Sequence, residues 1–212
     1  MCACRNNNKD VVELLLSRGA GEHIPDGDYS LVVAIKNKNK EIINLLLKFG
    51  IKVDAWSFCF MSGNGDEEMV EAFLRTGANP NMETKDGMTP LYEAIRRKRV
   101  GVVELLLKTG ANPDGNDAGH FTPLMFACRE GYTEIAQLLL NAGAGVNLQD
   151  YIIPWNSWTA LMYASQEGHT DIVRLLLRHG ADKYIMTDGM FAIDLARRSR
   201  HKEIVEMLEN AE

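Results

Sequence analysis

The sequence predicts an all-α solenoid in which helix-turn-helix units stack one on the next. A leucine-rich segment ending in glycine recurs along the chain, as in VVELLLSRG, IINLLLKFG, VVELLLKTG and IVRLLLRHG. Successive glycines at these ends are 31, 27, 33, 33 and 37 residues apart, so one unit is about 33 residues long. Such a period is typical of repeat proteins, in which each unit packs only on its neighbours.

The first helix of a unit is expected to begin at a Thr-Pro pair. Thr89-Pro90 and Thr122-Pro123 supply a hydroxyl that caps the helix and a proline at a position where no N–H is needed. The second helix of a unit carries a wide apolar face suited to burial between neighbours. In the unit ending at Gly110 its apolar residues are Val102, Val103, Leu105, Leu106 and Leu107.

The closing glycines and the segments after them predict turns. A glycine at the end of a helix readily adopts the left-handed conformation that terminates it. Polar connectors rich in Asn, Asp and Gly, such as ANPDGNDAGH, then favour tight turns.

Three segments, DGMTPLYEA, FTPLMFACREGYTEIAQLLLNAGA and WTALMYASQEGHTDIVRLLLRHGAD, resemble the ankyrin repeat. The resemblance covers essentially the whole chain and implies an ankyrin-repeat solenoid whose units are joined by β-turn or hairpin fingers. The usual His of the Thr-Pro-Leu-His motif is replaced by Tyr92, Met125 or Met162, so its hydrogen bond is absent. We expect a single ankyrin repeat domain, 1–212, with units at 1–20 (partial), 21–54, 55–81, 82–114, 115–147, 148–183 and 184–212 (C-terminal cap).

Composition and charge argue against several classes of partner. The chain of 212 residues is 46% hydrophobic and has 23 basic against 29 acidic side chains, a net charge of −6, which disfavours nucleic acid. It has no apolar run long enough to span a bilayer and no apolar core of a secretory signal. We expect a monomeric, intracellular protein without a membrane partner, in the cytoplasm, the nucleus or, for a bacterial pathogen, the host cytosol.

Catalytic motifs are not found in the sequence. It contains no HExxH, GxGxxG or GxxxxGK, and its histidines fall at turns or helix ends of different units, where we interpret them as exposed or turn-capping. The four cysteines form no CxxC pair, and we expect reduced thiols, with Cys59 and Cys128 buried in helices. We therefore predict no catalytic residue, no metal, no cofactor and no enzymatic activity.

Irregular repeats are the places where specificity is expected. The 37-residue interval inserts an apolar finger, QDYIIPWNSW, whose large side chains are Tyr151, Ile152, Ile153, Trp155 and Trp158. Either this finger protrudes and fills a pocket of a partner, or it folds back onto an adjacent finger or first helix. The 27-residue interval instead loses most of a finger, so the groove is expected to be open there. We expect its apolar residues Trp56, Phe58, Cys59 and Phe60 to pack inside rather than form a second contact site.

Two columns of first-helix residues give further candidates. The residue before the first-helix Ala is aromatic in neighbouring units, Phe126 and Tyr163, which either line a groove under the finger or belong to the inter-repeat core. Two residues after that Ala the side chain is mainly cationic, and Arg96-Arg97 favour an acidic ligand unless nearby acids such as Glu130 neutralise them. The predicted partner-binding residues are Tyr151, Ile152, Ile153, Trp155, Trp158, Phe126, Tyr163, Arg96, Arg97, Arg129, Glu130 and Gln166.

The resemblance implies a non-enzymatic module that binds a partner protein or peptide on a concave face of fingers and first helices, as an adaptor, scaffold or inhibitor. We expect this partner to carry apolar and acidic groups. One alternative is a modified-lysine reader with a cage at Trp158, Tyr163 and Glu167. Another is a substrate-recruiting domain of a larger enzyme. The incomplete first unit is expected to leave Val11, Leu14 and Leu15 partly exposed, so either the chain is a segment of a longer protein or its first unit is frayed.

Overall fold

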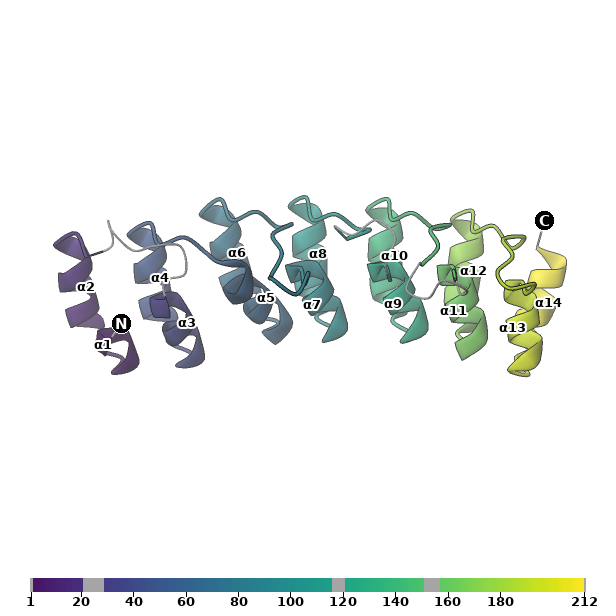
Figure 1. The fold of residues 1–212 in the computed structure, drawn as a ribbon, viewed down its shortest axis with the longest axis horizontal. Coiled ribbons are helices and arrows are strands. Elements are labelled where there is room, and N and C mark those ends of the chain that lie inside the picture. The colour runs from purple at the N-terminus through teal and green to yellow at the C-terminus, as the bar shows by residue number, and fades with distance from the viewer. Residues whose placement is uncertain (1, 21–28, 116–120, 151–156, 212) are drawn as a thin grey trace. The chain divides into compact units, whose positions relative to one another are not determined.

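Pairs of short antiparallel helices form the architecture of the computed structural model, which describes residues 2–20, 29–115, 121–150 and 157–211 (Figure 1). These residues contain fourteen helices and no strand, apart from isolated bridges at Gln149–Thr159 and Thr187–Met190. The all-α class is therefore confirmed. The chain divides into two compact halves, an N-terminal half at 1–109 and a C-terminal half at 110–212.

In the N-terminal half, odd-numbered helices pack on odd-numbered ones and even-numbered helices on even-numbered ones, so that two layers form. The odd-numbered helices are the first helices of the pairs. Their bounds are α1 Cys2–Arg5, α3 Tyr29–Lys36, α5 Ala55–Asn64 and α7 Pro90–Arg96. The second helices are α2 Lys9–Ser17, α4 Lys40–Lys48, α6 Glu67–Arg75 and α8 Val100–Lys108.

The C-terminal half repeats this layering with six helices. Its first helices are α9 Pro123–Arg129, α11 Ala160–Glu167 and α13 Ala192–Arg198. Its second helices are α10 Thr133–Asn141, α12 Thr170–Arg178 and α14 Lys202–Asn210.

The residues predicted to begin and end helices do so in the structure. The Thr89 hydroxyl accepts a hydrogen bond from Tyr92 N at 3.1 Å, and the next Thr-Pro pair caps α9 in the same way. At the other end of a unit, Gly143 takes a φ of +90° after α10, and the amide that follows it bonds back to Leu139 O at 3.0 Å. The ends of these helices are thus set by residues next to them in the sequence.

The core lies between the helices of each half. The apolar face of α8 is buried at Val102, Val103 and Leu106, as its pattern indicates. In its own layer α2 packs on α4. Its residues Leu14 and Leu15 are 53% and 48% exposed, as the sequence predicts. In the described ranges no helix is long and apolar enough to cross a bilayer.

Candidate functional site

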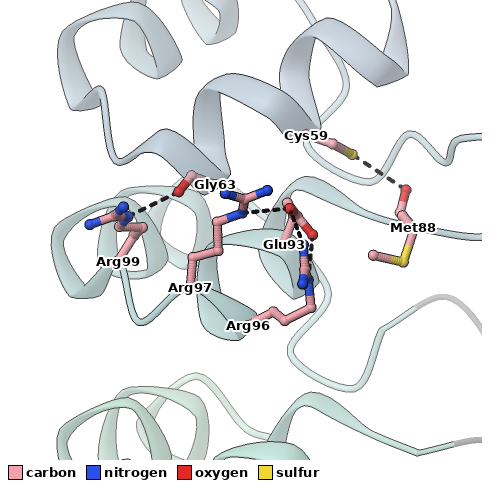
Figure 2. Close-up of polar contacts among 7 residues, drawn as sticks. All are labelled: Cys59, Gly63, Met88, Glu93, Arg96, Arg97 and Arg99. Atoms are coloured by element: carbon pink, nitrogen blue, oxygen red, sulfur yellow. Dashed lines mark hydrogen bonds and ion pairs between the residues drawn. The ribbon is translucent and has the colours of Figure 1, made fainter.

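The arginines of α7 converge on one buried carboxylate. Arg96 Nε lies 2.8 Å from Glu93 Oε2, Arg96 Nη2 lies 2.7 Å from Glu93 Oε1, and Arg97 Nε lies 2.9 Å from the same Oε1 (Figure 2). Glu93 is 7% exposed, whereas the two arginine side chains are nearly half exposed. We call these three residues the arginine cluster; the acid that pairs with Arg96 and Arg97 belongs to their own helix.

Neighbouring α5 makes room for this cluster through a glycine. A Cβ added to Gly63 would lie 2.9 Å from Glu93 Cγ and 3.1 Å from Arg97 Cδ, so only glycine permits this close approach. Arg99 Nε also donates to the Gly63 carbonyl at 2.9 Å, which ties α5 to the start of α8 (Figure 2). The backbone of α5 and the side chains of α7 thereby form one packed surface.

The electrostatics of the cluster leave a surplus of positive charge. Burial raises the pKa of Glu93, but hydrogen bonds from Arg96 and Arg97 outweigh burial and hold that pKa below its ordinary value. Glu93 is thus ionised at neutral pH. Two guanidinium groups against one carboxylate give the cluster a net charge of about +1 at neutral pH.

Aromatic side chains of α5 lie beside the arginine cluster. Trp56 stacks on Phe60 with ring centroids 5.0 Å apart, and Trp56 is 41% exposed. The expectation that the apolar residues of this short unit pack inside is therefore wrong for Trp56, although it holds for Phe58 and Cys59, which are buried. Because α5 is apolar on every side, its sequence does not determine which side chains face outward.

Cys59 faces the same region but is not a nucleophile. Its Sγ lies 3.4 Å from the carbonyl oxygen of Met88 (Figure 2). Burial, together with the nearby carboxylates of Glu93 and Asp54, raises the pKa of the Cys59 thiol to about 12. A thiol with this pKa is protonated at neutral pH and reacts slowly.

The C-terminal half carries a second group of interest, an aromatic cluster of Phe121, Phe126, Trp158 and Tyr163. Tyr163 contacts Trp158 and Phe121, each with centroids 5.1 Å apart, and Phe121 contacts Phe126 at 6.1 Å. The sequence analysis singled out Phe126, Trp158 and Tyr163 as candidates and missed Phe121. A signal was available, since aligning Thr122 with Thr159 places Phe121 in register with Trp158.

A buried aspartate holds this cluster in place. Asp150, 2% exposed, accepts a hydrogen bond from Trp158 N at 2.8 Å and another from the Tyr163 hydroxyl. Its own N–H donates to Trp158 O at 3.0 Å. Burial, and then the bond to Asp150, raise the pKa of Tyr163. The base of the long finger is thus fixed to α11.

Arg129 covers the other side of the aromatic cluster. Its guanidinium carbon lies 4.6 Å from the Phe121 ring centroid and 5.2 Å from that of Phe126, and its Nη2 pairs with Glu130 at 3.0 Å. Phe126 is only 8% exposed and therefore offers little surface. Trp158 and Tyr163 are half-buried, as is Gln166, whose carbonyl lies 3.0 Å from His201 Nε2.

Several predicted site residues lie beyond what the structure describes. Tyr151, Ile152, Ile153 and Trp155 fall outside the described residues. The next finger carries two large apolar side chains that the sequence reading overlooked, Tyr184 and Met186, which are 73% and 57% exposed. Because they sit in a finger of regular length, no insertion marked them.

The histidines of the described residues have structural roles. His169 Nε2 lies 3.0 Å from the Arg129 carbonyl, and its ring packs against Gly131. His179 Nε2 lies 3.3 Å from Gln137 Nε2. The turn-capping interpretation is confirmed for His169 and also for His201. Within the described ranges, no three His, Cys, Asp or Glu side chains are grouped so as to hold a metal ion.

Comparison with known proteins gives one family. The family model described as "Ankyrin repeats (3 copies)" matches residues 1–57, 58–150 and 151–212, which together cover the chain. A search of curated proteins found no match. The resemblance read from the sequence motifs is therefore confirmed at the level of the family.

Proposed function

Because the chain belongs to the ankyrin repeat family, whose members are generally protein–protein interaction modules, we propose that it is a non-enzymatic module that binds a partner protein or peptide on its first-helix and finger face. It acts there as an adaptor, scaffold or inhibitor. The proposed contact residues are those predicted from the sequence, with Tyr184 and Met186 added from the structure.

The aromatic cluster is the observation that carries this proposal. Half-buried aromatic rings beside a guanidinium are the kind of surface that supplies hot spots in protein interfaces. The Tyr163 hydroxyl and the Trp158 backbone N–H are hydrogen-bonded to Asp150, and the two rings pack on each other, so we expect little conformational entropy to be lost when they are covered. In the sequence, residues 151–156 follow Asp150 directly and include the apolar candidates Tyr151, Ile152, Ile153 and Trp155.

Affinity measurements on finger variants test the proposal. A partner is first captured from lysate, identified and purified, and its Kd is then measured by calorimetry. Trp155→Ala or Ile153→Ala should weaken binding by about 2 kcal/mol, roughly 30-fold, while the melting temperature stays unchanged. Leu14→Ala is the matched control, since Leu14 is an exposed apolar residue of the second-helix layer. Variants that lose stability and keep their affinity would contradict the proposal.

A modified-lysine reader is a less well supported alternative. An aromatic cage holds an ammonium group between rings, but Trp158 and Tyr163 contact each other directly and Arg129 already covers Phe121. Equal binding of methylated and unmodified peptides would exclude this reader. A substrate-recruiting role in a larger enzyme requires the same protein-binding surface and differs only in the identity of the partner.

A further inference from the structure

We propose that the first-helix face of α3, α5 and α7 binds an acidic peptide segment, with carboxylates at its ends and an apolar side chain between them. This inference rests on the proposed function and names the chemistry of one partner. The carboxylates would meet Lys36 at one end and the arginine cluster at the other. The apolar side chain would lie on Trp56 and Phe60.

The surface is a pair of adjoining pockets that share one residue. A pocket of about 720 Å³ is lined by Lys36, Lys38 and Phe60 among others. A second pocket of about 260 Å³ is lined by Phe60, Trp56, Arg96 and Arg97. Because Phe60 lines both, the pockets form one groove across α5, which we call the α5 groove.

A short connection leaves this groove open. Only residues 49–54 join α4 to α5, whereas residues 76–89 join α6 to α7. Asp54 caps α5 directly, with its Oδ1 2.9 Å from Ser57 N, so the chain enters the helix without forming a finger. The Trp56 ring is consequently left 41% exposed on the first-helix layer.

The groove presents cations at both ends. Lys36 Nζ lies 5.6 Å from the Trp56 ring centroid, and no carboxylate of the described residues forms an ion pair with it. Its neighbour Lys38 is likewise exposed. At the other end, Arg97 uses only its Nε on Glu93, and no hydrogen bond within the described part of the chain occupies its Nη1 or Nη2.

Carboxylates near the groove do not cancel these cations. The Glu93 carboxylate already forms ion pairs with both Arg96 and Arg97. Asp66 is engaged by Lys40, whose Nζ lies 3.2 Å away. Glu67 lines the larger pocket and Asp86 the smaller one, and both side chains are exposed, so water and salt screen their charges.

A carboxylate is the anion that this geometry favours. Arg97 offers a planar pair of N–H donors. Arg96 already donates two such hydrogen bonds to the Glu93 carboxylate, in bidentate geometry. The stacked pair of exposed Trp56 and half-buried Phe60 gives the apolar side chain of the segment an area to cover. Charge and shape thus specify an acidic–apolar–acidic order.

Peptide selection tests this inference. Random twelve-residue peptides displayed on phage are selected on the full chain, and the Kd of the best ones is measured by fluorescence polarisation. We expect enriched sequences with Asp or Glu on both sides of an apolar residue. Replacing the acid that contacts the arginine cluster by its amide should weaken binding about tenfold to the parent chain and less than twofold to Arg97→Gln.

Two further variants keep the test decisive. Trp56→Ala should weaken the same peptides about tenfold, and because the side chain is 41% exposed we expect this variant to fold, which its melting temperature checks. Arg75→Gln, an exposed arginine of α6, should have no effect. Selected peptides without acidic residues, peptides insensitive to Arg97→Gln, or no enrichment at all would overturn the inference. The proposed function would stand if partner binding still depends on Trp155 or Ile153.

Discussion

Arg96 donates two parallel hydrogen bonds to Glu93 across one turn of α7, Nε to Oε2 at 2.8 Å and Nη2 to Oε1 at 2.7 Å. Arg97 adds a third bond to the same carboxylate. A carboxylate this well satisfied stabilises the folded state only while it is ionised. The arginine cluster therefore links the stability of the N-terminal half to pH.

Replacing Glu93 by Gln should lower the free energy of unfolding by about 1–2 kcal/mol at pH 7. The pKa of Glu93 is lower in the folded than in the unfolded chain, so its contribution is present above the unfolded value, about 4.3, and is lost as pH falls through the folded value. Urea denaturation from pH 7 to pH 3 measures this. Parent and variant should converge at the acid end, whereas Glu104→Gln, which removes an exposed pair with Lys108, should change little. A difference independent of pH would contradict this account.

Gly63→Ala should destabilise the chain although alanine is the better helix former. The helix gains about 1 kcal/mol from the substitution, but the new Cβ would lie 2.9 Å from Glu93 Cγ, which is too close to the backbone of α7 to move freely. We expect a net loss of about 1 kcal/mol in thermal or urea unfolding. Asn64→Ala, at an exposed neighbouring position of the same helix, is the control. Equal or greater stability of Gly63→Ala would show that α7 shifts without cost.

Helix ends could be predicted from the sequence because their causes are local. The Thr-Pro caps, the closing glycines and the buried face of α8 each depend on residues within one or two turns. The exposed Leu14 and Leu15 also followed from the incomplete first unit.

Side-chain partners were harder to predict. The pairing of Glu93 with arginines three and four residues later was not predicted, although that spacing places the three side chains on one helix face. The outward position of Trp56 could not be read from a helix that is apolar all round. Asp150 was missed because its bonds to Trp158 and Tyr163 join residues 8 and 13 positions apart, a separation that no local sequence pattern marks.

Tyr163→Phe should remove part of the alkaline sensitivity of the C-terminal half. The folded pKa of Tyr163 is raised, so its hydroxyl contributes stability below the unfolded pKa, about 10, and this contribution is lost as pH rises. The variant also leaves Asp150 Oδ2 without this donor, at a cost of about 1–3 kcal/mol near pH 7. Denaturation from pH 7 to pH 11 should show a loss that shrinks with increasing pH. Tyr184→Phe, at a 73% exposed position, should match the parent, and a Tyr163 variant that also matches it would refute the prediction.

Thiol labelling should separate one cysteine from the other three in the folded chain. Cys2 is exposed, whereas Cys4, Cys59 and Cys128 are buried, and burial raises the pKa of Cys59 to about 12 and that of Cys128 as well. Since the thiolate is the reactive form, we expect one fast equivalent with a disulfide reagent at pH 8 and four in urea. Cys4 should follow next, because α1 is a single turn and opens locally. Peptide mapping assigns each site, Cys2→Ser should abolish the fast phase, and rapid labelling of Cys59 or Cys128 would contradict the packing described for α5 or α9.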